Sequence, residues 1–108
     1  MPNKNYNRGV EKERLVIEQL EKVGYIAMRT AGSHGVFDVI GLSPTGIRFI
    51  QVKRGKEECD VIYDCKLAKE KMKDLPRLPN VSYEVWGWHD CNGWIVQEWE
   101  AGREGEGE

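Results

Sequence analysis

One segment of the chain has the hydrophobic spacing of an amphipathic helix, a second has the boundary residues of a helix, and strand-like segments lie between and after them. Apolar residues recur every three or four positions near the start, which predicts a helix over residues 8–23 that ends at Gly24. A second helix is predicted over residues 64–75, with Asp64 as its N-cap, because prolines follow it. Strands are expected at residues 25–29, 37–42, 47–53, 81–88 and 94–99. The resulting order, αβββαββ, predicts an α/β fold.

Short polar segments separate these elements. Ser43-Pro-Thr-Gly46 has proline at the second position of a turn, so the strands on either side should form an antiparallel hairpin. A second hairpin is expected around residues 90–93. Residues 31–35 should form a turn-rich loop, and the polar residues 54–61 a mobile loop.

Length and charge bound the possible functions. A chain of 108 residues is long enough for one domain but too short for two separate cores. Its net charge is uneven, because residues 1–97 carry fifteen Lys and Arg against thirteen Asp and Glu, whereas residues 98–108 carry one Arg against five Glu. We therefore expect one mildly basic domain over residues 1–100, which permits DNA binding, and a disordered acidic tail over residues 101–108.

Composition excludes several other classes of protein. The mean hydropathy is −0.61 and no apolar run has the length of a membrane span or signal peptide, so we expect no membrane association and, by default, a cytoplasmic location. The three cysteines form no closely spaced pair, and His89 with Cys91 supplies too few ligands for zinc. The four tryptophans fall in the last hairpin and are interpreted as packing residues.

Glu13 is the one charged residue on the apolar face of the first helix. It lies three residues after Val10 and four before Ile17, so its carboxylate points toward the expected core. A carboxylate in that position needs a cation or a hydrogen-bond donor. The alternative is that Glu13 lies at the edge of the apolar stripe and reaches solvent.

Polar side chains also interrupt two neighbouring strands. Gln51 and Lys53 are two residues apart and therefore project from the same face, while Asp38 lies on the other strand of the first hairpin. The Asp38 carboxylate, the Gln51 amide oxygen and the Val52 carbonyl are the oxygen ligands that Mg²⁺ prefers. Such an ion would neutralise charge on a phosphodiester and activate water, and the Lys53 ammonium would complete the site. The alternative is that these are ordinary exposed residues on half-buried strands.

Several segments resemble archaeal-type Holliday junction resolvases, which belong to the PD-(D/E)xK nuclease superfamily. The order and spacing match through residue 53, and the resemblance extends in general form over residues 7–100. The matching segments are Arg8-Gly-Val-Glu-Lys-Glu-Arg-Leu15, Gly24-Tyr25, Arg29-Thr-Ala-Gly-Ser33, Phe37-Asp-Val-Ile40, Ile50-Gln-Val-Lys53 and Gly93-Trp-Ile-Val-Gln-Glu98. The resemblance implies a PD-(D/E)xK nuclease-like core, in which helices flank a central mixed sheet.

The resemblance also implies roles for individual residues. Glu13 is similar to the family's helix-borne acidic residue that assists metal or water binding, Asp38 to its metal ligand, and Lys53 to its catalytic lysine. Ser33 resembles a serine near the scissile phosphate. The residues expected to contact DNA are Arg14, Arg29, Ser33 and Arg54. The implied activity is Mg²⁺-dependent cleavage, with Mn²⁺ as a substitute, by a homodimer whose two sites nick symmetric strands of a four-way junction.

The sequence departs from the family's pattern at two points. Gln51 replaces the usual glutamate, which keeps an oxygen ligand but removes a negative charge, so metal binding should depend more on Glu13 and Asp38. The loop after Ser33 also differs, with His34-Gly-Val-Phe37 in place of a tighter connection. Two alternatives stay open: a nuclease that acts on other branched or linear DNA, and a non-catalytic DNA-binding module. Lys53 favours an enzyme, because a degenerate site has no use for a lysine facing Asp38.

Overall fold

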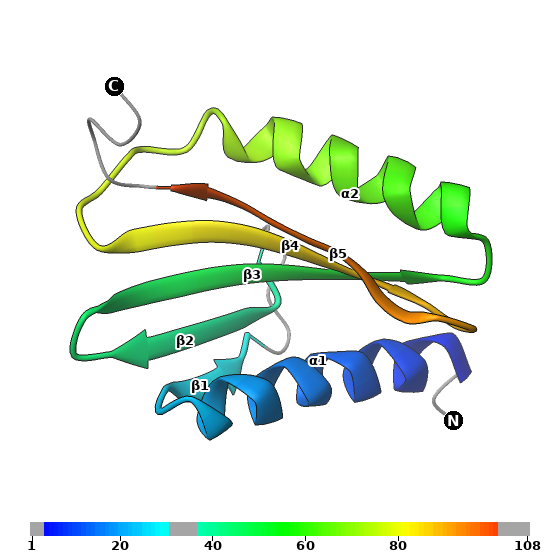
Figure 1. Cartoon of the computed structure of the whole chain (residues 1–108), viewed down its shortest axis with the longest axis horizontal. Coiled ribbons are helices and arrows are strands. Elements are labelled where there is room, and N and C mark those ends of the chain that lie inside the picture. Colours follow the sequence, from blue (N-terminus) through cyan, green and yellow to red (C-terminus); the bar gives the residue numbers. More distant parts are fainter. Residues whose placement is uncertain (1–3, 31–36, 102–108) are drawn as a thin grey trace.

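The computed structural model describes residues 4–30 and 37–101, with side chains described for residues 10–30 and 37–97. Helices and strands follow the order that the sequence predicts, and together they form an α/β fold (Figure 1). The elements are α1 (Lys4–Lys22), β1 (Ile26–Arg29), β2 (Val39–Ser43), β3 (Gly46–Gly55), α2 (Glu58–Met72), β4 (Val81–His89) and β5 (Gly93–Ala101).

The strands form one mixed sheet in the order β1-β2-β3-β4-β5. β1, β2 and β3 are consecutive antiparallel strands, β3 and β4 run parallel, and β5 returns antiparallel to β4. Parallel neighbours need a crossover connection, which α2 supplies. This confirms the predicted mixed sheet flanked by helices.

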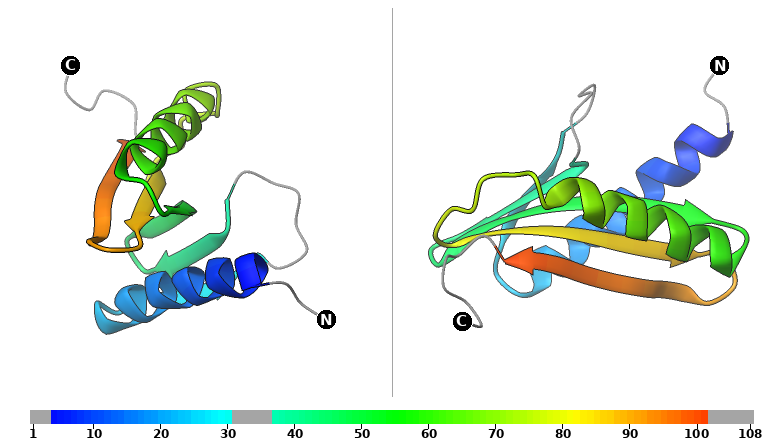
Figure 2. Two further views of the ribbon diagram at one scale, coloured as in Figure 1. Left: turned by 90° about the vertical axis from the view of Figure 1, so that its right-hand side faces the viewer. Right: turned by 90° about the horizontal axis from the view of Figure 1, so that it is seen from above.

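The two helices lie on opposite faces of the sheet and cover different strands (Figure 2). Helix α1 contacts β1, β2 and β3, whereas α2 contacts β3, β4 and β5. Each helix packs against a separate hydrophobic cluster. The buried residues of the α1 cluster are Val16, Leu20, Val39, Ile50 and Trp86, and those of the α2 cluster are Val61, Cys65, Ala68, Met72, Tyr83 and Val85.

Strand β3 is shared by both cores because its side chains alternate between the two faces. Phe49 packs against the α2 cluster, while Ile50 and Val52 belong to the α1 side. By the same alternation, Gln51 and Lys53 project from the α2 face. This alternation agrees with the prediction that Gln51 and Lys53 point the same way.

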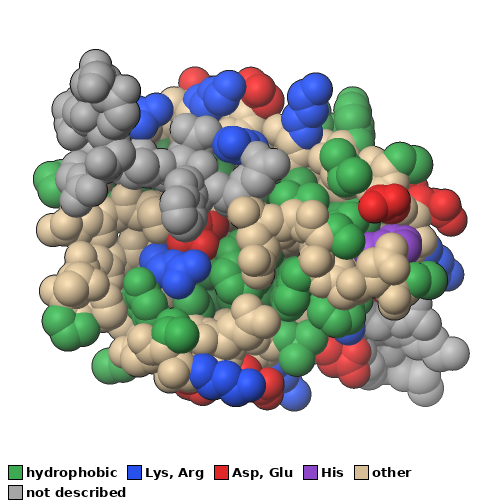
Figure 3. Space-filling model, viewed as in Figure 1, with side chains coloured by type: hydrophobic (Ala, Val, Ile, Leu, Met, Phe, Trp, Pro, Cys, Tyr) green, Lys and Arg blue, Asp and Glu red, His purple; other side chains and the backbone are tan. Residues whose placement is uncertain are grey.

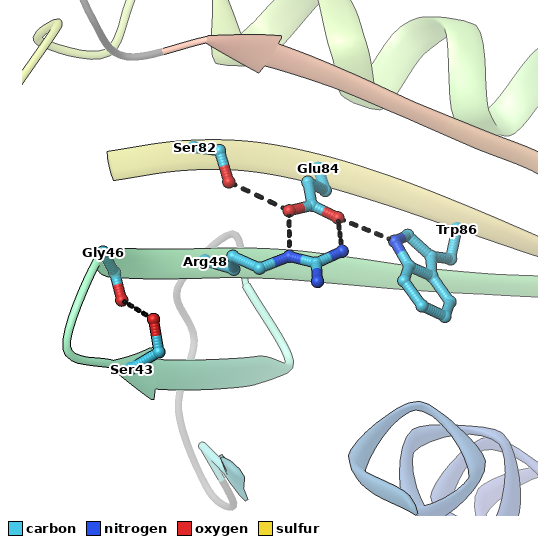
Figure 4. A network of polar contacts seen from close by, with 6 residues as sticks. All are labelled: Ser43, Gly46, Arg48, Ser82, Glu84 and Trp86. Carbon is cyan, nitrogen blue, oxygen red and sulfur yellow. Dashed lines mark hydrogen bonds and ion pairs between the residues drawn. The ribbon is translucent and has the colours of Figure 1, made fainter. Parts of the chain in front are cut away.

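A polar network joins β3 to β4 on the α1 face (Figure 4). The Arg48 guanidinium donates two hydrogen bonds to the Glu84 carboxylate, at 2.6 and 2.8 Å. Ser82 Oγ and Trp86 Nε1 donate to the same carboxylate at 2.9 and 3.0 Å. Both Glu84 oxygens therefore have two donors each, as a buried charge requires.

Gly87 sets how closely α2 approaches the sheet. A Cβ at this position would lie 2.6 Å from Cys65 Sγ and 2.7 Å from Val61 Cγ1. The pairing of β4 with β5 is also irregular between Gly87 and Trp88. The absence of a side chain at Gly87 lets the first turns of α2 rest directly on β4.

The prediction of a mobile loop over residues 54–61 is wrong. β3 continues to Gly55, and α2 already begins at Glu58, six residues before the predicted N-cap Asp64. Glu57 occupies the N-cap without a side-chain cap bond, and Asp64 is an exposed residue within the helix. The helix starts early because Val61 begins the buried stripe that continues through Cys65, and this packing outweighs the weak cap.

Other boundaries differ less. Helix α1 begins at Lys4 rather than at residue 8, and β2 begins at Val39 rather than at Phe37. The predictions for Ser33, for the 31–35 loop and for residues 102–108 of the acidic tail lie outside the described residues. Among the residues that the structure describes, no helix is long and apolar enough to cross a membrane.

Candidate metal and phosphate site

The chain bends sharply at Asp38, immediately before β2. Phe37 packs on the α2 side, where its ring lies 5.6 Å from that of Tyr83, whereas Val39 is buried on the α1 side. Residues two apart in a regular strand face the same way, so these opposite orientations mark a bend between them. The expectation that Asp38 lies within the strand is therefore wrong: it precedes the strand.

Backbone hydrogen bonds hold Asp38 between two strands. Its N–H donates to the Ile50 carbonyl at 2.9 Å, and its carbonyl accepts from the Thr30 N–H at 3.0 Å. Thr30 also donates its hydroxyl to the Phe37 carbonyl at 2.6 Å, which fixes the preceding peptide. These contacts place the Asp38 side chain at the edge of β3, between the two faces of the sheet.

The Asp38 carboxylate accepts a hydrogen bond from β3 at a position where the backbone of a neighbouring strand would otherwise pair. The β2–β3 ladder ends at the pair Val39 and Ile50, while β3 runs on to Gly55. Beyond the end of that ladder, the Val52 N–H donates to Asp38 Oδ2 at 2.9 Å. The N–H and C=O of one strand residue point the same way, so the Val52 carbonyl also faces this open edge.

Charged groups from both faces of the sheet act on Asp38. Burial raises the pKa of the Asp38 carboxyl above its ordinary value, and the hydrogen bond from Val52 opposes this shift. The negative charge of Glu13 raises the same pKa further, whereas Lys53 and Arg29 lower it. Glu13, Arg29 and Lys53 therefore all lie within electrostatic reach of Asp38.

Glu13 has a cationic partner, as its place on the apolar face of the helix requires. Arg29 Nε donates to Glu13 Oε1 at 2.8 Å, and the two side chains are 25% and 19% exposed. Arg29 was predicted to contact DNA; in the structure it pairs with Glu13. The Glu13 carboxylate thus reaches the site from α1 rather than turning to solvent.

Gln51 supplies an oxygen for which the described part of the chain offers no hydrogen-bond partner. Gln51 Oε1 is buried and makes no hydrogen bond among the described residues. A buried acceptor left unpaired costs about 1–3 kcal/mol, so it is the kind of atom that a bound cation or water would satisfy. Lys53 lies two residues further along the same face and is half-buried.

These atoms fit a hard divalent cation. Glu13, Asp38, Gln51 and the Val52 carbonyl offer oxygen atoms only, which is the donor set of Mg²⁺ and Mn²⁺. Only two carboxylates are present, and the described residues contain no group of three or more His, Cys, Asp or Glu that could hold a metal ion. A metal site here would therefore need the Gln51 amide and the Val52 carbonyl as further donors, with water completing the shell.

The other arginines predicted to contact DNA have different surroundings. Arg14 is exposed on α1, next to Glu13 in the sequence. Arg54 donates to Asp90 Oδ2 at 2.6 Å, so its charge is already balanced.

On the face drawn in Figure 3, basic side chains along the α2 edge are interspersed with acidic ones, and hydrophobic side chains cover much of the sheet.

The sequence of residues 4–78 matches the family model described as archaeal Holliday junction resolvase (hjc). The chain belongs to the archaeal Holliday junction resolvase family. The match runs from the start of α1 past the end of α2, so it contains every predicted site residue. Membership implies an endonuclease that acts on Holliday junctions.

A solved structure supports the resolvase fold independently. The chain is similar to Hjc from Archaeoglobus fulgidus, a Holliday junction resolvase from an archaeal hyperthermophile, with a TM-score of 0.54 and 19% identity. The similarity covers 88% of this chain and 73% of that one. No curated protein matches the chain significantly. At this identity the structural similarity establishes the PD-(D/E)xK nuclease fold alone.

Two contacts within this candidate site were not predicted from the sequence. Thr30 fixes the peptide before Asp38, and Arg29 pairs with Glu13. The signal for the second contact was present, because a carboxylate on an apolar helix face demands a partner. The nearest strand after the helix contains one arginine, and that residue is Arg29.

Proposed function

We propose that this chain is a Mg²⁺-dependent endonuclease that resolves four-way DNA junctions by paired symmetric nicks, with Mn²⁺ able to replace Mg²⁺. The observation that carries the proposal is that the Asp38 carboxylate accepts a hydrogen bond from the Val52 N–H on β3, while the charges of Glu13 and Lys53 act on that carboxylate. Gln51, the residue before Val52, has a buried side-chain oxygen without a hydrogen-bond partner among the described residues. Family membership supplies the substrate class.

Each group has a role that its position supports. Asp38 and Gln51 would hold the ion with the Val52 carbonyl, and Glu13 would hold it directly or through water. A divalent ion bound there neutralises charge on the phosphate and lowers the pKa of a bound water. Lys53 would orient the attacking water and stabilise the negative charge that develops on the phosphate. Arg14, exposed beside Glu13, would contact the DNA backbone.

Two nicks on symmetric strands require two copies of this site. We therefore propose that the chain acts as a homodimer. The nuclease domain, predicted over residues 1–100, also includes Ala101, the last residue of β5, and the rest of the acidic tail is proposed to lie outside it. Light scattering coupled to gel filtration tests the dimer: a mass of twice 12.4 kDa is expected, and a monomer that still makes paired nicks would contradict it.

Junction cleavage tests the proposal most directly. The full chain would be incubated with a four-way junction, a three-way junction, a flap and a linear duplex, in Mg²⁺, Mn²⁺ or EDTA. We expect paired nicks in the four-way junction, only with metal, and losses of at least about 100-fold for Asp38→Asn and Lys53→Ala.

Matched substitutions outside the site control for general effects. Asp74→Asn and Lys66→Ala change the same residue types at exposed positions and should cleave normally. If the wild type and all variants gave the same result in the cleavage assay, with or without metal, the chain would be a non-catalytic DNA-binding module. Cleavage of the linear duplex as fast as the four-way junction would indicate a nuclease of broader substrate class.

A further inference from the structure

Among the described residues, the charges that act on one another at the site cancel. Glu13 and Asp38 contribute two carboxylates, and Arg29 and Lys53 contribute two cations that act on the same Asp38 carboxyl. Gln51 adds no charge. A divalent ion entering this arrangement would therefore leave a local excess of positive charge, which is unfavourable in a half-buried position.

Arg29 is held where it can take the place of that ion. Its Cα is paired with Val39 in the β1–β2 ladder, directly beside Asp38. Its side chain lies on the α1 face, and Nε donates to Glu13 Oε1 at 2.8 Å. The guanidinium thus neutralises one carboxylate that the proposed metal site needs, and its charge also acts on the other.

We propose that Arg29 is a built-in counter-cation of the metal site: its guanidinium holds Glu13 and must release it before Glu13 can serve the divalent ion. The inference rests on the proposed function, since it concerns the same site. Arg29 acts through Glu13 and is therefore a positioning residue. Its presence weakens metal binding by competition and by charge repulsion.

Removing the arginine charge should therefore tighten metal binding. In Arg29→Gln, Glu13 is available to the ion and one opposing charge is gone, so the dissociation constant for Mn²⁺ should fall about tenfold or more. In Arg29→Lys the charge stays but the planar guanidinium is lost, so an intermediate value is expected. An arginine with a merely structural role would give the opposite result, because a loosened site binds metal more weakly.

The test is a titration of the full chain with Mn²⁺ in the absence of DNA. Binding is measured by calorimetry and by the paramagnetic resonance signal of free Mn²⁺. Arg14→Gln is the matched control, because it removes the same charge one residue from Glu13 but at an exposed position. Its dissociation constant should stay within about twofold of the wild type, since exposed charges are screened. Thermal unfolding verifies that each variant is folded. If Arg29→Gln is not folded, Arg29→Lys takes its place in the comparison with Arg14→Gln.

The outcomes separate the inference from the proposed function. Tighter binding in Arg29→Gln than in Arg14→Gln supports the counter-cation. Equal or weaker binding in Arg29→Gln and Arg29→Lys overturns it, while loss of binding in Asp38→Asn would still uphold the metal site. Failure of every protein, wild type included, to bind Mn²⁺ would overturn both.

Discussion

Two arginine–glutamate pairs lie against the sheet, and their surroundings differ in a way that separates a structural ion pair from an exchangeable one. In the pair formed by Arg48 and Glu84, the carboxylate is 3% exposed and receives four hydrogen bonds from three side chains (Figure 4). In the pair formed by Arg29 and Glu13, the carboxylate is 19% exposed and the one hydrogen bond described comes from Arg29 Nε.

The difference shows how a buried charge can serve the fold alone or stay available for chemistry. Glu84 has no capacity left for a ligand, because both oxygens already have two donors. Glu13 retains an oxygen atom for which the structure describes no donor, and it lies close enough to Asp38 to raise the pKa of that carboxyl. The Glu84 network holds β3 against β4, whereas the Glu13 pair lies beside the open edge of β3.

The largest effect on stability is expected at the fully hydrogen-bonded pair. Glu84→Ala leaves the Arg48 charge partly buried without its partner, so the free energy of unfolding should fall by about 3 kcal/mol. Glu13→Ala should cost less than about 1 kcal/mol, because Asp38 still balances Arg29 and is relieved of repulsion from Glu13. Urea denaturation of both variants measures the contrast. Equal losses would show that both pairs are structural.

A smaller effect, on metal affinity, is expected when Gln51 is replaced by the glutamate that is usual in the family. Gln51→Glu places a third carboxylate at an oxygen position that has no partner, so the dissociation constant for Mn²⁺ should fall about tenfold. Calorimetric titration without DNA provides the measurement. Gln97→Glu, at an exposed position on β5, is the control and should leave the constant unchanged. Unchanged binding in Gln51→Glu would place Gln51 outside the metal shell.

The smallest effect is a pH-dependent gain of stability in Asp38→Asn. Burial raises the pKa of Asp38 in the folded protein above its ordinary value near 3.8, so ionised Asp38 makes folding less favourable. Below that ordinary value both states are protonated and the penalty vanishes; it develops as pH rises through the folded pKa and is constant above it. In EDTA, Asp38→Asn should therefore be more stable than the wild type at pH 7, with the gain disappearing near pH 3.5.

The control for this measurement is Asp74→Asn, an exposed substitution of the same kind in the segment after α2. It should show no comparable gain at pH 7. A loss of stability in Asp38→Asn at neutral pH would mean that the Val52 hydrogen bond outweighs burial. The open-edge site would then stabilise the fold in the same way as the Arg48 and Glu84 pair, and the contrast between the two regions would disappear.

Much of this fold could be predicted from hydrophobic periodicity, and the exceptions have physical causes. The first helix and the two hairpins follow from apolar spacing and turn residues, whereas the mixed sheet was implied by the resemblance to the resolvase family. The start of α2 was missed because Asp64 has the chemistry of a cap, whereas the stripe that begins at Val61 decides the boundary by packing. Cap residues are weaker signals than a continuous buried stripe.

The composition of the candidate site stays a prediction, and its geometry could be predicted only in part. Alternation along β3 predicts that Gln51 and Lys53 share one face, and the opposite placement of Phe49 and Ile50 agrees with that alternation. The bend at Asp38 could not be predicted in this way, since it depends on hydrogen bonds from Thr30 and to Ile50, which are distant in the sequence. The same limitation applies to Arg54, whose partner Asp90 lies at the far end of β4.

The late start of β2, at Val39, has a further consequence for engineering. If β2 ran alongside β3 as far as Gly55, its backbone would take up the Val52 amide and carbonyl, and the Asp38 carboxylate would lose its hydrogen bond from Val52. A more regular sheet would thus be more stable and would have no room for an ion. Redesign for thermal stability should therefore leave this irregularity intact, because the proposed metal site lies along the part of β3 that β2 does not pair.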